Sequence, residues 1–125
     1  MDEIVFENSD IVIKKENSSI PWVKIFTKIH YKELTDCPEE LRKKLYKYIE
    51  ITEKSMLSFY SPEKINIAIF GNYLQHLHIH IMARFKDDEF FPESMWGKKQ
   101  RESSLSLPSF EEFKNILIKA ITTLS

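Results

Sequence analysis

The sequence of 125 residues lacks the features that mark disulfide-rich, membrane-spanning and secreted proteins. Its single cysteine, Cys37, excludes an internal disulfide framework. No segment approaches the roughly 18 consecutive apolar residues of a membrane span. The acidic start, Met1-Asp2-Glu3, lacks the basic-then-apolar layout of a signal peptide. We therefore expect a cytoplasmic protein with no membrane partner.

An excess of either charge is also lacking. The chain has 18 Lys and Arg residues against 19 Asp and Glu residues, which gives a net charge of −1. Proteins that bind nucleic-acid backbones usually carry a strong basic excess, so we expect no nucleic-acid partner. The one local basic run, Lys98 to Arg101, is typical of a solvated loop.

Glycine is scarce as well. Only Gly71 and Gly97 occur, so we expect each to mark a position where the backbone requires it. The rest of the composition is ordinary for a globular protein, with 42% hydrophobic, 30% charged and 13% aromatic residues. The length suits a single domain over residues 1–125, with a core over about 4–100 and a C-terminal helix over about 109–123.

Hydrophobic periodicity divides the chain into five strands and two helices. Strands are expected over 4–6, 11–13, 22–29, 64–70 and 76–85, the last two joined as a hairpin through Gly71-Asn72. One helix is expected to start at the capping pattern Asp36–Glu39 and to end at Ser61, and a second to start at Ser109. This set of elements allows an α+β fold.

Three of the four histidines fall within five residues, at His76, His78 and His80. Side chains alternate along a strand, so the three would line one face at intervals of ~6.6–6.8 Å. The residues that alternate with them are apolar: Leu77, Ile79, Ile81, Ala83 and Phe85. Burial of that apolar face would fix the register and direct three titratable rings to one small volume.

Imidazoles titrate near neutral pH and can act as nucleophile, acid or base. Attack by a neutral imidazole on phosphorus gives a covalent phosphoramidate, which splits one hard displacement into two easier ones. The alternative is a metal site, because a His-x-His pair on a strand is a common zinc geometry. The nearest carboxylates for such a site are Asp87 and Asp88. We favour the first interpretation and expect no metal or other cofactor.

The segment His76 to Met82 resembles the His-φ-His-φ-His-φ-φ signature of the histidine triad (HIT) family. Its surroundings are similar to a subfamily of short bacterial HIT proteins at Pro21-Trp22, Lys64–Asn72, Arg84–Asp88, Pro92 and Trp96-Gly97. The resemblance covers most of the chain and is weakest at its two ends. It implies a HIT-like α+β fold, an antiparallel sheet of about five strands with two helices, and a homodimer.

The resemblance also implies a nucleotide hydrolase or transferase that acts at the α-phosphate of a nucleotide conjugate. Dinucleoside polyphosphates, nucleoside phosphoramidates and adenylylated compounds are the candidate substrates. His78 would be the nucleophile that forms a nucleotidyl-histidine, His80 would hold its environment, and His76 would sit near the leaving group. In this subfamily the first triad position is often Gln. The resemblance further implies a nucleotide site that includes Asn66, Gly71, Asn72 and His30.

Two departures from the family pattern concern the leaving group rather than the nucleophile. Many members carry Ser or Thr three residues before the first histidine, where this chain has Tyr73. The loop between Asn66 and the triad also lacks the usual glycine-rich stretch. The two departures leave the substrate type and the leaving-group chemistry open. Two alternative functions also stay open, a non-catalytic nucleotide-binding or interaction protein and a metal-dependent hydrolase.

Overall fold

A computed structural model describes residues 2–124, so Met1 and Ser125, the ends of the expected domain, lie outside the described residues. The elements in chain order are β1 (Ile4–Glu7), β2 (Ile11–Lys15), β3 (Trp22–Thr27), a 3-10 turn (Leu34–Asp36), α1 (Glu39–Tyr60), β4 (Lys64–Ile69), β5 (His78–Arg84) and α2 (Phe110–Thr122). The expected α+β fold with a five-stranded sheet and two helices is confirmed.

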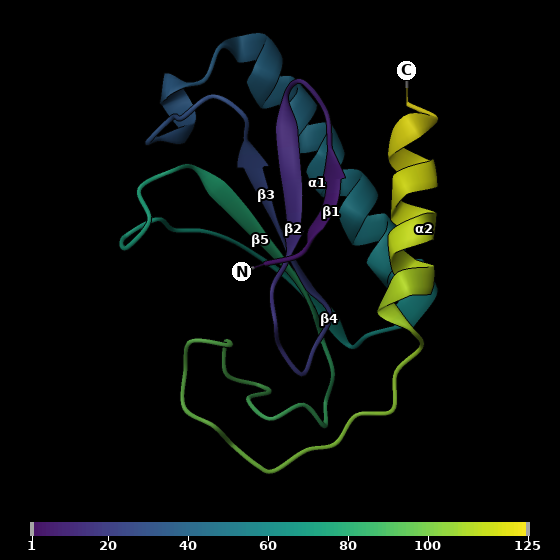
Figure 1. The fold of residues 1–125 in the computed structure, drawn as a ribbon. Coiled ribbons are helices and arrows are strands. Elements are labelled where there is room, and N and C mark those ends of the chain that lie inside the picture. Colours follow the sequence, from purple (N-terminus) through teal and green to yellow (C-terminus); the bar gives the residue numbers. More distant parts are fainter. Residues whose placement is uncertain (1, 125) are drawn as a thin grey trace.

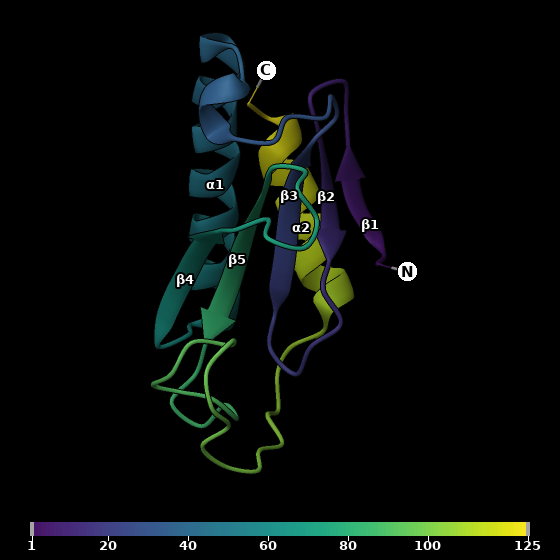
Figure 2. The same cartoon turned by 90° about the vertical axis from the view of Figure 1, so that its left-hand side faces the viewer.

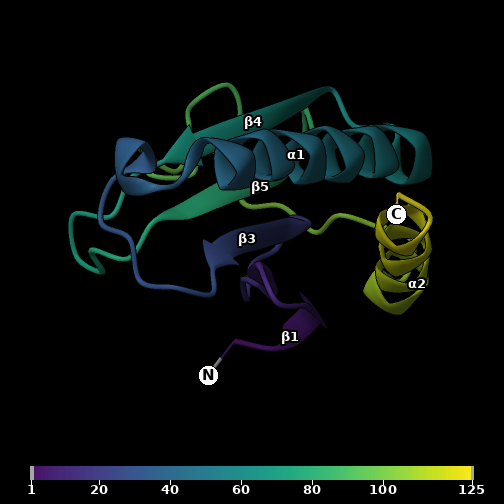
Figure 3. The same cartoon turned by 90° about the horizontal axis from the view of Figure 1, so that it is seen from above.

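The five strands form one antiparallel sheet in the order β1-β2-β3-β5-β4, which places β5 between β3 and β4. Both helices lie on the same face of the sheet (Figure 1). Helix α1 packs on β4, β5 and α2, and α2 also contacts β1 (Figure 3). Figure 2 looks onto the opposite face, where no helix covers β3 and β5.

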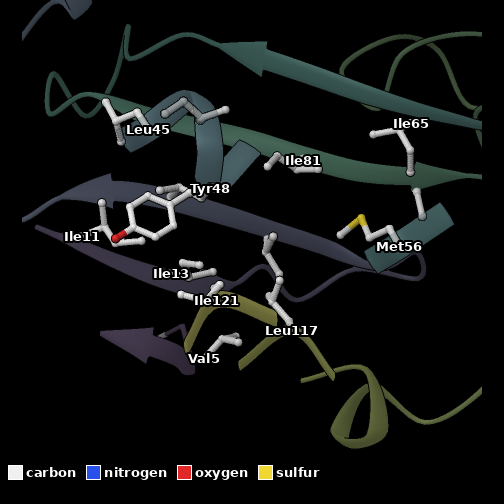
Figure 4. Close-up of a cluster of buried hydrophobic side chains, with 14 of the residues drawn as sticks. Val5, Ile11, Ile13, Leu45, Tyr48, Met56, Ile65, Ile81, Leu117 and Ile121 are labelled. Carbon is white, nitrogen blue, oxygen red and sulfur yellow. The ribbon is translucent and has the colours of Figure 1, made fainter. Parts of the chain in front are cut away.

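The core lies between the sheet and the two helices, with contributions from strands and helices alike (Figure 4). On β5, Ile79, Ile81 and Ala83 are fully buried in this core, as their alternation predicts. Burying a side chain such as Ile stabilises a fold by roughly 1.5–3 kcal/mol. A one-residue slip of β5 would exchange these residues for histidines, so the core holds the register.

The helix starts differ from expectation in one place. Helix α1 begins at Glu39, and its N-cap is Pro38, which has no side chain able to cap. The Asp36 carboxylate instead accepts the Glu33 N–H within the preceding 3-10 turn, so the predicted Asp36–Glu39 capping box is wrong. At α2 the Ser109 hydroxyl accepts a hydrogen bond from the Glu111 N–H, as an N-cap should.

No helix of residues 2–124 has the length and hydrophobicity needed to cross a membrane.

Candidate active site

The helix-free face of the sheet carries a cavity of about 390 Å³ that contains two of the triad histidines. Its lining comes from β3, the β4–β5 loop, β5 and the loop after β5: Lys24, Phe26, Phe70, Gly71, Asn72, Tyr73, Leu74, His78, His80 and Trp96. A larger hollow of about 770 Å³ beside residues 101–108 contains no histidine. The smaller cavity is therefore the candidate active site.

His78 is held by a hydrogen bond to the main chain. Its Nδ1 lies 2.7 Å from the carbonyl oxygen of His76, and its ring stacks on Phe26 with centroids 4.9 Å apart. A carbonyl oxygen can only accept, so Nδ1 carries the proton. The neutral ring then has its lone pair on Nε2, the nitrogen available for attack on an electrophile.

His80 has the opposite arrangement. The indole Nε1–H of Trp22 donates to His80 Nδ1 at 3.1 Å, and an indole can only donate, so this nitrogen carries the lone pair. The neutral ring therefore bears its proton on Nε2. The side chain is only 6% exposed. Burial, together with the electrostatic influence of His78 and Lys24, lowers the pKa of His80 to about 4, so the ring is neutral at pH 7.

His76 lies before β5 and not on it, so the prediction that all three histidines line one strand face is wrong for this residue. The pairing of β3 with β5 ends at Phe26 and His78, which leaves His76 without a strand partner. Its Nε2 lies 2.7 Å from the carbonyl oxygen of Thr27, and the ring does not line the cavity. The structure thus gives no support to a position of His76 near the leaving group.

The four residues expected around a nucleotide lie in three different places. Gly71 and Asn72 line the cavity. His30 is exposed and does not line the cavity, and its ring centroid lies 4.9 Å from that of His76. Asn66 lies outside the cavity, and its Oδ1 accepts from Arg84 Nη1 at 2.8 Å.

Lys24 is a site residue that the sequence analysis did not identify. It stands opposite His80 in the β3–β5 register and lines the cavity. Burial opposes its charge, but hydrogen bonds from its ammonium to Asp2 (2.6 Å) and Glu16 (3.0 Å) outweigh burial and raise the pKa of Lys24. The alternation of residues 22–29 places Lys24 on the face of Trp22, which was the available signal.

The loop after β5 is fixed by a buried ion pair. Arg84 Nε and Nη2 donate to the Asp88 carboxylate at 3.0 and 3.1 Å, and Arg84 Nη2 also donates to the Glu93 carbonyl oxygen at 2.7 Å. Burial of Asp88 would raise its pKa, but the bonds from Arg84 and from main-chain N–H groups lower it. Asp88 therefore anchors the loop that carries Trp96.

Among residues 2–124, no group of three or more His, Cys, Asp or Glu side chains is arranged to hold a metal ion.

Comparison with known proteins shows what the chain is similar to. A search of curated proteins finds no match to the chain. Among solved structures, a histidine triad protein from Marinobacter aquaeolei VT8 superposes with a TM-score of 0.80 at 22% identity, covering 99% of this chain and 91% of that one. One from Bradyrhizobium japonicum gives 0.77 at 21% identity, covering 99% and 91%.

A zinc-bound histidine triad family protein from Mycobacterium smegmatis is more distant, with a TM-score of 0.61 at 18% identity over 97% of this chain and 84% of that one. At these identities the superpositions show a shared fold. The family model described as HIT domain matches residues 2–87, a span that contains β1 to β5 and both cavity histidines. The chain therefore belongs to the HIT family.

Proposed function

We propose that the chain is a nucleotide hydrolase or transferase that cleaves a nucleotide conjugate at its α-phosphate through a covalent nucleotidyl-His78. HIT family membership supports a nucleotide-binding or hydrolase-type function in general. The observation that carries the finer proposal is the 2.7 Å hydrogen bond from His78 Nδ1 to the His76 carbonyl oxygen. It makes Nε2 of a cavity-lining histidine the nucleophilic nitrogen.

In the first step the lone pair on His78 Nε2 attacks the α-phosphorus, and the bond from phosphorus to the leaving group breaks. The leaving group takes that electron pair and, where it is an amine, a proton from solvent. The imidazole becomes a positively charged phosphoramidate. The His76 carbonyl oxygen, bonded to Nδ1–H, lies where this charge develops and stabilises it. Water then attacks the phosphorus, the P–Nε2 bond breaks, and the nucleoside monophosphate leaves while the water proton passes to solvent.

His80 serves this reaction as a neutral donor. Its proton is on Nε2, so it can donate a hydrogen bond to a phosphate oxygen without bringing a charge of its own. The positive charge of the cavity belongs to Lys24, which attracts an anionic substrate, although Asp2 and Glu16 offset it. Tyr73 lies on the rim with a fully exposed side chain, and it is the candidate for the part that Ser or Thr plays in many relatives.

The proposal is tested by incubating the protein with a panel of adenylyl conjugates. We expect AMP release and, after rapid acid-free quenching, an adenylyl mass on the peptide that contains His78. Binding of the conjugates without AMP release or adduct would favour a non-catalytic nucleotide-binding protein. Turnover that exhaustive chelation abolishes would favour a metal-dependent hydrolase instead.

We also propose that the chain is a homodimer that uses the β4 edge. Strand β4 pairs only with β5, so its outer main-chain groups have no strand partner among the described residues. Ile67 and Ile69 beside this edge are 42% and 45% exposed, which is unusual for apolar residues on the core face of a sheet. Solution mass measurement at micromolar concentration should give twice the chain mass, and Ile67→Lys should shift it to the monomer. A monomeric wild type would contradict this proposal.

A further inference from the structure

Two half-exposed aromatic rings stand together beside the candidate active site. Phe70 is 50% exposed and Trp96 is 49% exposed, and their ring centroids lie 4.7 Å apart at an interplanar angle of 67°. Trp96 also contacts the ring of His80 edge-on, with centroids 5.0 Å apart. The pair, here called the aromatic wall, thus touches a triad histidine and still leaves about half of each side chain to solvent.

The backbone presents these two rings on tight turns. The only two glycines of the chain, Gly71 and Gly97, directly follow Phe70 and Trp96. Gly71 has φ +122°, a conformation that other residues rarely adopt. A Cβ at Gly97 would lie 3.1 Å from the Glu93 Cβ and 3.2 Å from the Ser94 carbonyl oxygen. Both turns are therefore tight, and each places one ring on the rim of the cavity.

The aromatic wall separates two hollows on the same face of the sheet. Both of its rings line the 390 Å³ cavity with the histidines and also a second hollow of about 350 Å³. The second hollow is lined by Asn66 as well. The Asn66 side-chain oxygen, Oδ1, accepts a hydrogen bond from Arg84. Its amide nitrogen, Nδ2, is therefore the atom that can donate to a bound molecule.

Exposed aromatic rings beside a hydrogen-bond donor suit a planar heteroaromatic ring as ligand. Such a ring gains stacking energy on the aromatic wall, and its ring nitrogens can accept from a donor such as the Asn66 amide. We propose that the aromatic wall and the second hollow bind a nucleobase of the substrate. This inference rests on the proposed function. The base can come from the nucleoside transferred to His78 or from a second nucleoside in the leaving group, and the experiment separates these sources.

The test compares two substrates, adenosine phosphoramidate with a small amine leaving group and diadenosine tetraphosphate. Trp96→Leu removes the planar ring at similar bulk, whereas Trp96→Phe keeps one, and Phe70→Leu and Phe70→Tyr repeat the contrast on the other ring. We expect the Leu variants to raise KM by about 5- to 150-fold, the factor that loss of one base–aromatic stack produces, and to change kcat less. The Phe and Tyr variants should raise KM much less than the Leu variants at the same positions.

An equal rise in KM for both substrates assigns the wall to the base of the transferred nucleoside. A rise for diadenosine tetraphosphate alone assigns it to the second base. KM values unchanged for both substrates would overturn the inference. Tyr46→Leu, at an exposed ring on α1 outside both hollows, is the matched control.

If the wild type releases no AMP from either substrate, the proposed function fails while this inference can still be decided. In that case calorimetric titration with AMP and with intact diadenosine tetraphosphate replaces the kinetics. Weaker binding by the Leu variants, but not by the Phe and Tyr variants, would then support a base site. Equal affinities in all variants would overturn it.

Discussion

His78 and His80 share one strand, one face and a ring-centroid separation of 4.8 Å, yet their surroundings dictate opposite proton positions. The Nδ1 of His78 meets a carbonyl oxygen, and the Nδ1 of His80 meets an indole N–H. The first ring therefore has its free lone pair on Nε2, and the second has its proton on Nε2. Residue type alone does not distinguish two such imidazoles, but their hydrogen-bond partners do.

The largest effect should follow removal of the nucleophile. His78→Ala leaves no nitrogen in its place, so the covalent route should be lost entirely rather than slowed. The fold should survive, because the core contacts of Ile79 and Ile81 are unchanged. Mass spectrometry for the adenylyl adduct, AMP release and thermal unfolding check the three parts of this prediction. An adduct that still forms in the folded variant would refute the role of His78.

Removing His80 should be less severe. His80→Ala leaves His78 bonded to the His76 carbonyl group, so the adduct should still form, at a rate reduced by the ~10²–10⁴-fold usual for acid–base or hydrogen-bond assistance. His76→Gln should have a smaller effect than His80→Ala, because the carbonyl group that holds His78 belongs to the main chain. Single-turnover adduct formation measures both variants. A greater loss in the His76 variant would mean that the side chain, and not the carbonyl group, supports catalysis.

The sequence predicts the orientation of His78 and His80 but not the partners that distinguish them. Alternation with Ile79 and Ile81 is a local pattern, and burial of the apolar face determines it. The bond from Trp22 to His80 joins positions 58 residues apart, so it depends on the pairing of β3 with β5.

The wrong prediction that His76 lies on the strand has a similar cause. Histidine alternation continues to His76, but β5 starts where the pairing with β3 starts, at His78. Main-chain pairing across the sheet thus starts the strand two residues later than the side-chain pattern indicates. Lys24 and Trp96 were missed as site residues for the same reason, since each reaches the cavity from a different segment of the chain.

The burial of His80 should also appear in the pH dependence of stability. His80 has a pKa of about 4 in the folded protein and an ordinary value of 6.5 when unfolded, so the unfolded chain binds more protons between these values. Stability should therefore fall as the pH drops from 7 to 4.5, by on the order of 2–3 kcal/mol from this group.

Urea unfolding of the wild type and of His80→Gln at both pH values measures this contribution. The glutamine variant does not titrate, so its free energy of unfolding should fall less over the same range. Asp88 should not obscure the comparison, because its lowered pKa places its own loss of stability below this window. Parallel pH profiles for the two proteins would contradict a buried, neutral His80.

The smallest expected effect isolates the hydrogen bond that sets His80 apart from His78. Trp22→Phe keeps an aromatic ring but removes the indole donor, so neutral His80 should populate both tautomers. The rate should fall by only about two- to tenfold, the worth of one neutral hydrogen bond. Nitrogen-15 shifts of the neutral His80 ring report its tautomer. Trp96→Phe is the matched control: Trp96 contacts the same ring with centroids 5.0 Å apart, but it makes no hydrogen bond to His80 within residues 2–124. The control should retain the wild-type tautomer. If both variants shift the His80 resonances alike, aromatic packing and not the indole donor fixes the tautomer, and the contrast between the two histidines would need another cause.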